Sequence, residues 1–236
     1  MDERSQLVNA MTDNHPTEAP GILMKRVRGY NALVTLFFGG RRGRLNRALA
    51  KASRARAGDR VLDIGCGPGR FAQVLADTVG AGGAVVGVAP SPPMVEYATR
   101  HAGRLANCRF EPGVAQLLHL PDAAFDVVIA TFVMHHVPAE HRTAAMSHMF
   151  RVLRPGGRLL IADMYPTGRL APALVRGLTR IATRRQDDPF DDLDVRRYTQ
   201  TLRDIGFEEL AFATAKPWTG FLTAVRPGGT PADSPR

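Results

Sequence analysis

Residues 61–70 read VLDIGCGPGR, an apolar run followed by glycines at alternate positions. The apolar side chains at 61, 62 and 64 predict a short buried strand. Apolar positions at helical spacing follow from Phe71 to Val79, and Pro68 suits the first turn of that helix. Glycines allow the main chain to turn tightly and let a ligand approach it without meeting a Cβ atom. The stretch predicts a strand, a glycine turn and a helix whose N-terminus faces a ligand.

The spacing of the glycines separates two classes of ligand. A dinucleotide fingerprint has the spacing G-x-G-x-x-G, with a pyrophosphate over the helix N-terminus. Here the spacing is G-x-G-x-G, and Asp63 lies two residues before the first glycine. A carboxylate at this place repels a pyrophosphate and suits a ligand with an ammonium group, such as S-adenosylmethionine (SAM). A purely structural turn between strand and helix is the alternative.

The stretch resembles the glycine-rich loop of class I SAM-dependent methyltransferases. The wider pattern is similar to the family that includes the menaquinone and ubiquinone C-methyltransferases, known as methyltransferase types 11 and 25. Later signatures of that family have close matches in DAAFD (122–126), MHHV (134–137) and RVLRPGG (151–157). The resemblance covers about residues 30–225.

Strand and helix patterns alternate along the chain in agreement with this resemblance. They predict an α/β, Rossmann-like, doubly wound and mostly parallel sheet with a C-terminal antiparallel strand pair and an N-terminal helical lid. The predicted domains are a disordered tail (1–20), the lid (21–57), a methyltransferase domain (58–226) and a loose tail (227–236). After the first strand, the predicted strands are 84–88, 108–111, 125–130, 158–163, 207–214 and 218–225. The predicted helices are 92–101, 140–153, 170–185 and 195–205, with a turn at 154–157.

Composition fits a single α/β domain with appendages. The chain has 236 residues, of which 44% are hydrophobic, and two cysteines that we expect to be free thiols. Its first twenty residues are polar and lack the apolar segment of a signal peptide, so we expect a cytoplasmic protein without a transmembrane segment.

The net charge of +9 leaves three kinds of partner open: nucleic acid, anionic lipid or an acidic molecule. Basic side chains recur at helical spacing at 44, 47, 51 and 54, opposite Leu45, Ala48, Leu49 and Ala52. A solvated helix face is the first interpretation, and contact with a membrane surface or RNA is the second. This helix has no interleaved aromatic residues, which disfavours RNA, so no nucleic-acid partner is expected.

The resemblance implies a set of cofactor-binding residues. Asp63 would bind the ammonium group of the methionine moiety, and the end of the fourth strand would line the sulfonium. The implied set is Tyr30, Asp63, Gly65, Cys66, Gly67, Gly69, Ala89, Pro90, Met94, Val114, Ala115 and Thr131.

Two positions of this set depart from the family pattern. Ala89 stands where an acid normally accepts the ribose hydroxyls, and Val114 stands where an Asp normally receives the adenine amino group. A charged hydrogen bond contributes about 1.5–3 kcal/mol, so both losses weaken nucleoside binding unless other groups compensate. The candidates for compensation are Ser91, Gln116 and His119. Changing Ala89 and Val114 to Asp is expected to tighten SAM binding.

Methyl transfer is an in-line displacement that needs a base only where the acceptor loses a proton. His135 and His136 follow the fourth strand and are the candidate catalytic bases, although adjacent residues cannot both face one ligand. Asp163 and Tyr165 are further polar groups expected at the mouth of the site. No metal site is predicted, because no histidine has a partner at ligand spacing.

Three functions remain open at this stage. The first is SAM-dependent methyl transfer to a small, aromatic or lipophilic acceptor, bound by the lid and residues 164–195. The second is a repurposed fold that catalyses a cyclisation or rearrangement with SAM unreactive or absent. The third is a non-enzymatic ligand-binding module. The expected partner is a small-molecule acceptor, peripheral membrane contact stays open, and the protein is expected to be a monomer or homodimer.

Overall fold

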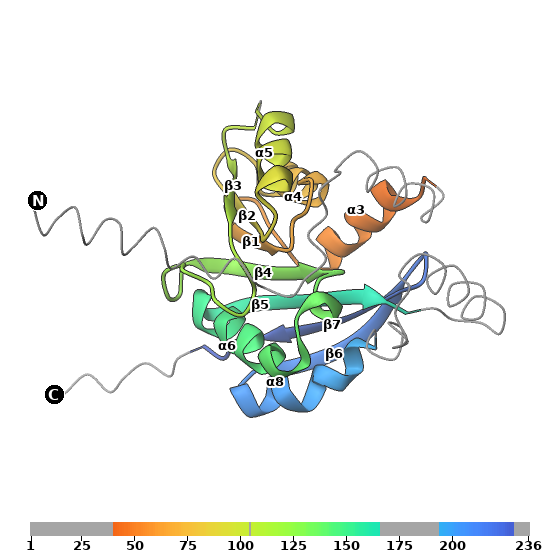
Figure 1. Cartoon of the computed structure of the whole chain (residues 1–236). Helices are drawn as coiled ribbons and strands as arrows, with labels where there is room; N and C mark the ends of the chain where they lie inside the picture. The colour runs from red at the N-terminus through yellow and green to blue at the C-terminus, as the bar shows by residue number, and fades with distance from the viewer. Residues whose placement is uncertain (1–39, 104, 166–193, 229–236) are drawn as a thin grey trace, which may run out of the picture.

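The computed structural model describes residues 40–103, 105–165 and 194–228 (Figure 1). The predicted lid around Tyr30 and the predicted helix 170–185 lie outside the described residues, as does most of the proposed acceptor segment.

The core of the protein is a seven-stranded sheet in the order β3-β2-β1-β4-β5-β7-β6 (Figure 1). Strands β1 to β5 pair in parallel with one another, whereas β7 is antiparallel to both β5 and β6. The predicted Rossmann-like architecture with a closing antiparallel pair is confirmed. The strands are β1 (Arg60–Ile64), β2 (Ala84–Ala89), β3 (Cys108–Pro112), β4 (Phe125–Thr131), β5 (Leu153–Met164), β6 (Glu208–Ala215) and β7 (Thr219–Val225).

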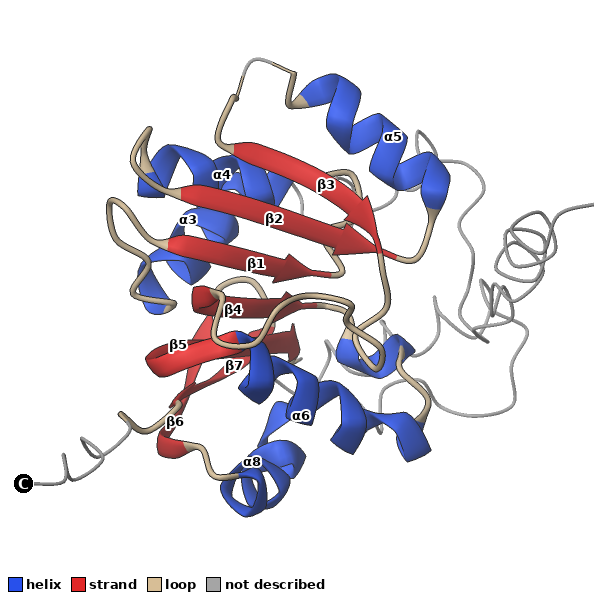
Figure 2. Cartoon of the chain, turned by 90° about the vertical axis from the view of Figure 1, so that its left-hand side faces the viewer, coloured by secondary structure: helices blue, strands red, loops and turns tan. Residues whose placement is uncertain are grey.

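Helices cover both faces of the sheet, as a doubly wound fold requires. Helices α3 and α4 lie on one face, and α6 and α8 lie on the other (Figure 2). Each layer buries its own apolar cluster against the sheet. The helices are α3 (Arg42–Ala52), α4 (Arg70–Val79), α5 (Pro92–His101), α6 (Arg142–Val152) and α8 (Thr199–Ile205), with short 3-10 turns at Met134–His136, Ala139–His141 and Val195–Tyr198.

The register of the parallel strands brings their carboxyl ends to one edge. Asp63 near the end of β1 lies opposite Gly87 of β2 and Ile129 of β4. Thr131, the last residue of β4, lies opposite Ala162 of β5. Ligands of open α/β sheets bind at this edge, so the topology fixes where the site is formed.

Two predictions about turns need correction. Helix α4 begins at Arg70 with the left-handed Gly69 as its N-cap, so Pro68 precedes the helix instead of occupying its first turn. The predicted turn 154–157 is part of β5, whose register to β4 shifts between Leu153 and Arg158. Gly156 with φ +76° accommodates this irregularity within the strand.

The buried stripe of α3 is also rotated from its predicted position. Leu45, Asn46, Leu49 and Ala50 are buried, whereas Ala48 is exposed. Helix α3 packs against α4, and this contact selects the buried face. Arg44, Arg47 and Lys51 remain exposed, as expected for a solvated face.

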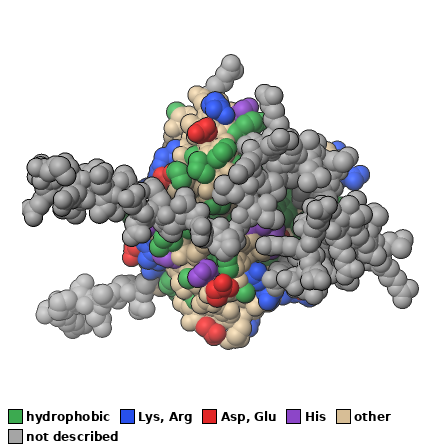
Figure 3. Space-filling view, viewed as in Figure 1, with side chains coloured by type: hydrophobic (Ala, Val, Ile, Leu, Met, Phe, Trp, Pro, Cys, Tyr) green, Lys and Arg blue, Asp and Glu red, His purple; other side chains and the backbone are tan. Residues whose placement is uncertain are grey.

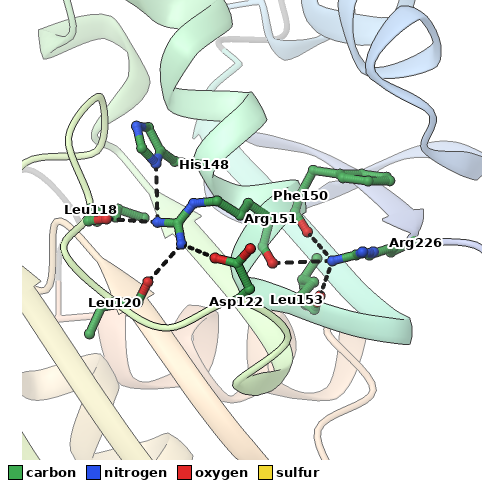
Figure 4. Close-up of polar contacts among 8 residues, drawn as sticks. All are labelled: Leu118, Leu120, Asp122, His148, Phe150, Arg151, Leu153 and Arg226. Carbon is green, nitrogen blue, oxygen red and sulfur yellow. Dashed lines mark hydrogen bonds and ion pairs between the residues drawn. The ribbon is translucent and has the colours of Figure 1, made fainter.

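Two arginines fix the segments around the start of β4 and the end of α6 (Figure 4). The guanidinium of Arg151 donates to the carbonyl oxygens of Leu118 and Leu120 and to the Asp122 carboxylate. The guanidinium of Arg226 donates to three carbonyl oxygens at the α6–β5 junction, those of Phe150, Arg151 and Leu153. The DAAFD and RVLRPGG signatures therefore include residues that serve structure.

Basic side chains on the visible face in Figure 3 are scattered among acidic and apolar ones where described residues are in view. Within the described part of the chain, no helix combines the length and the apolar character needed to cross a membrane.

Candidate functional site

The glycine turn between β1 and α4 needs glycine for two different reasons. Gly65 has φ +73°, and a Cβ atom there would lie 2.6 Å from the Cβ of Val133, so the turn packs tightly on the segment after β4. Gly67 has φ +52°, yet the nearest side-chain atom to an added Cβ is the sulfur of Met94 at 3.8 Å. The first glycine permits protein packing, and the second leaves an open approach to the main chain.

Hydrogen bonds from its main chain anchor the turn. The carbonyl oxygen of Val88 on β2 accepts from the N–H groups of Gly65 and Cys66, at 2.8 and 3.0 Å. The Cys66 thiol is buried beside Ala89 and Val95, and burial, followed by the Asp63 charge, raises its pKa well above the usual range. Cys66 therefore packs as an uncharged thiol and positions the turn.

Asp63 is the most unusual polar residue of this edge. It is 1% exposed, and within the described ranges neither carboxylate oxygen has a hydrogen-bond partner. Burial raises the pKa of this carboxyl from 3.8 to about 7, opposed by the positive charge of Arg42. An unpaired buried carboxylate is costly, and an ammonium donor relieves that cost. Asp63 thus fits the ammonium group of SAM.

The end of β2 and the loop after β3 lie next to each other, because the Gly113 N–H donates to the Ala89 carbonyl oxygen at 3.1 Å. Ala89 and Met94 are buried, and Pro90 is exposed. Both positions without the family's acids, 89 and 114, are thus brought to the site edge by the fold. The roles of these residues toward the cofactor stay predictions.

Residues 113–119 differ in how they meet the edge. Val114 is half-buried and pairs with Leu117 in a short bridge, whereas Ala115 packs into the large core cluster. Gln116 is half-buried and His119 is exposed.

The segment after β4 turns sharply over the glycine loop. Thr131 is half-buried at the end of the strand. The next residue, Phe132, has φ +55°, a conformation that costs a non-glycine residue about 1–3 kcal/mol. Its N–H donates to the carbonyl oxygen of Ala162 on β5 at 2.8 Å. This turn directs Val133 onto Gly65 and starts the 3-10 turn that carries the two histidines.

His135 and Asp163 form a pair that the sequence did not predict. Nδ1 of His135 lies 2.8 and 2.9 Å from the two carboxylate oxygens of Asp163 at the end of β5. One of these oxygens also accepts from the Met164 N–H, which fixes the carboxylate. A carboxylate accepts hydrogen bonds, so this contact favours the neutral tautomer in which Nδ1 donates and Nε2 carries the lone pair.

His136 differs from its neighbour although the two rings are 3.9 Å apart. The residue as a whole is exposed, although its ring is partly buried. This burial, and after it the charge of His135, lowers the pKa of His136 to about 4. No carboxylate bonds to it among the described residues. The two predicted bases therefore have unequal environments, and only His135 has an orienting partner.

Tyr198, which sequence reasoning did not single out, adds a buried hydroxyl near this pair. The residue is 4% exposed, and its hydroxyl has no hydrogen-bond partner in the part of the chain that the structure describes. Burial raises its pKa, an effect opposed by Arg142 and reinforced by Asp163. The periodicity that predicted helix 195–205 located only the apolar face of the helix. It therefore did not indicate that the Tyr198 hydroxyl would be buried.

Known proteins resemble this chain in both sequence and fold. Residues 61–157 match the family model described as "Methyltransferase domain". The uncharacterized methyltransferase YcgJ of Bacillus subtilis is 30% identical over 193 residues, which cover 78% of this chain and 71% of YcgJ. The 27-O-demethylrifamycin SV methyltransferase of Amycolatopsis mediterranei is 42% identical over 123 residues, 51% of this chain and 44% of that protein.

Two solved structures share the fold. A SAM-dependent methyltransferase from Aquifex aeolicus has a TM-score of 0.63 at 20% identity, covering 77% of this chain and 89% of its own. The [4+2]-cyclase SpnF has a TM-score of 0.62 at 21% identity, covering 79% and 82%.

Several curated relatives are longer than the region they share with this protein. The chain spans between 31% and 50% of their length in four cases. YcgJ, by contrast, is matched over 71% of its length. The sequence matches, the sheet order and the buried, unpartnered Asp63 agree with one another: this chain belongs to the class I SAM-dependent methyltransferase family, whose cofactor is S-adenosylmethionine.

Proposed function

We propose that this protein transfers a methyl group from SAM to a small, aromatic or lipophilic acceptor, and that His135 is the general base. The observation that carries the proposal is the contact of its Nδ1 with both oxygens of the buried Asp163 carboxylate. This contact leaves Nε2 as the proton acceptor at the carboxyl edge of the sheet. An acceptor that loses a proton on reaction, such as a hydroxyl compound, fits such a base.

The roles of the protein groups follow from this geometry. When bound, SAM would supply an electrophilic methyl group, and the electron pair of the C–S bond would remain with the sulfur. Nε2 of His135 takes the proton released by the acceptor atom that forms the new bond to carbon. Asp163 holds the ring in one orientation and stabilises the resulting imidazolium. Asp63 holds the cofactor's ammonium group, and the open main chain at Gly67 admits the ligand.

Similarity to a relative supports the class of acceptor. The relative from Amycolatopsis mediterranei is named a 27-O-demethylrifamycin SV methyltransferase, so its acceptor is the O-demethylated compound. The apolar residues 33 and 36–38 of the predicted lid favour an acceptor of the same kind. A nucleic-acid acceptor has less support, because the basic face of α3 carries no aromatic side chains.

The test uses the full chain, methyl-labelled SAM, and a set of probes: 27-O-demethylrifamycin SV, simple phenols and hydroxynaphthoquinones. We expect label transfer with equal formation of S-adenosylhomocysteine (SAH). His135→Gln should lower kcat about 10²- to 10⁴-fold with unchanged SAM affinity, and Asp163→Asn should lower it through misorientation of the ring. His136→Gln is the matched neighbour and should cost less than about tenfold. Equal losses for the two histidine variants would contradict the assignment of the base.

The same reactions distinguish the other two functions. Conversion of a probe without SAH formation would identify a repurposed fold, for which the likeness to the SpnF cyclase supports the shape alone. Tight binding of a probe without conversion would identify a binding module.

A further inference from the structure

Ser91 carries a hydroxyl group that the fold itself does not use. It lies two residues after Ala89, the last residue of β2, and immediately before α5. The residue is 5% exposed, and its Oγ atom has no hydrogen-bond partner among the described residues. Most buried hydroxyl groups are hydrogen-bonded, and an unpaired one costs about 1–3 kcal/mol. The Ser91 hydroxyl is therefore available for a hydrogen bond to a ligand.

A serine at this position usually caps the helix N-terminus through its side chain. The residues that follow Ser91 exclude this role. A serine N-cap accepts from the N–H of the second or third helical residue. In α5 the first two helical residues are Pro92 and Pro93, which have no N–H. The third is Met94, and its N–H donates to the carbonyl oxygen of Ser91 at 3.0 Å, as the Val95 N–H does at 3.1 Å. The side chain makes no cap hydrogen bond.

The position of Ser91 connects this hydroxyl with the cofactor site. Met94, in the first turn of α5, has its sulfur within 3.8 Å of a Cβ atom built on Gly67. The carbonyl oxygen of Val88, three residues before Ser91, binds the N–H groups of the glycine turn. Ser91 therefore lies, in sequence, between two residues that contact the glycine turn.

We propose that the Ser91 hydroxyl binds a ribose hydroxyl of the cofactor and replaces the contact of the acid absent at position 89. The inference rests on SAM as the family's cofactor and deepens the proposed function. A hydroxyl both donates and accepts, so it pairs with a ribose hydroxyl in either direction. A single neutral hydrogen bond replaces a charged one here, so cofactor binding is weaker than with an acid at position 89.

The test is calorimetric titration of the purified full chain with SAH. Ser91→Ala should raise the Kd about 2- to 10-fold, since one neutral hydrogen bond is lost. The unfolding temperature of the ligand-free protein should not fall, because Ser91→Ala removes a buried hydroxyl that has no partner among the described residues. Thr99→Val is the matched control on the same helix: the Thr99 hydroxyl donates to the Val95 carbonyl oxygen, and its loss should leave the Kd unchanged.

Deoxy analogues identify the part of the ligand involved. The loss in Ser91→Ala should disappear with the 2′-deoxy or the 3′-deoxy analogue of SAH, whichever lacks the contacted hydroxyl. An equal loss with both analogues, or no loss with SAH itself, would overturn the proposal. If the wild-type chain does not bind SAH, the cofactor premise fails and the inference fails with it, which is a distinguishable result.

Restoring the acid tests the replacement. In an Ala89→Asp background, the carboxylate should bind the ribose, so adding Ser91→Ala should cost less than it does in the wild type. The same loss in both backgrounds would show that Ser91 does not stand in for the acid.

Discussion

The two edges of the parallel sheet treat their polar groups in opposite ways. At the amino-terminal edge the polar side chains around the strand starts are paired: Asp59 with Arg158, Asp126 with the Arg60 N–H, and Asn107 with two carbonyl oxygens of the α4 end. At the carboxyl edge, Asp163 is paired with His135, but both oxygens of Asp63 and the hydroxyl of Ser91 are buried without partners among the described residues. The difference shows that the polar groups named at the amino-terminal edge are satisfied internally, whereas two polar side chains of the carboxyl edge keep the capacity to bind a ligand.

The largest effect is expected from breaking a pair at the amino-terminal edge. In Arg158→Met, the Asp59 carboxylate stays largely buried and loses its guanidinium partner at 2.7 Å. The free energy of unfolding should fall by about 3–5 kcal/mol, measured by urea denaturation. Adding Asp59→Asn should recover part of the loss. The affinity for SAH should not change, and a several-fold change would contradict the separation of the two edges.

The pH dependence of the ligand-free protein tests the carboxyl edge. Because the pKa of Asp63 is raised from 3.8 to about 7, the folded state binds a proton that the unfolded state releases between these values. The free energy of unfolding should therefore decrease as pH rises from about 4 to about 7, in total by up to about 4 kcal/mol.

The Asp63→Asn variant isolates this contribution, since it should lack that part of the decrease and leave the rest. SAH should bind more tightly as pH rises over the same range, because its ammonium group favours the ionised carboxylate. Identical pH profiles for the wild type and Asp63→Asn would contradict the raised pKa.

A smaller effect is expected when the unpaired carboxylate itself is removed. Asp63→Asn should weaken SAH binding about 10- to 150-fold at pH 8, since a charge-assisted hydrogen bond contributes about 1.5–3 kcal/mol. Calorimetry with 5′-methylthioadenosine, which lacks the ammonium group, is the control and should give equal affinities for both proteins. A similar loss for both ligands would assign Asp63 to structure and not to the amino-acid moiety.

Local patterns were sufficient for the fold. The apolar run before Asp63, the glycine turn and the alternation of strands and helices predicted the sheet that the structure confirms. Errors occurred where a contact between elements decides the outcome. The stripe of α3 was misplaced at Ala48 because its packing on α4, and not its periodicity alone, selects the buried face.

The residues of the candidate site could be predicted from the sequence better than the contacts between them. Asp63 and the two histidines stood out because Asp63 lies near the end of one strand and the histidines follow another, at the expected edge. No sequence pattern joined His135 with Asp163, since 28 positions separate them. No sequence pattern marked Tyr198 as a site residue. Ser91 was one of three candidates to compensate for the missing acids, until its burial and the prolines after it distinguished it.

The sequence by itself determined the family, the doubly wound and mostly parallel architecture, and the chemistry of the glycine turn. These depend on local conformational preferences and on whether a residue lacks a Cβ atom, carries an acidic group or has an apolar side chain. Only the tertiary structure decided which polar groups pair within the protein and which remain for a ligand. Pairing depends on distances of a few ångströms between elements far apart in the chain, and burial decides the cost of an unpaired group.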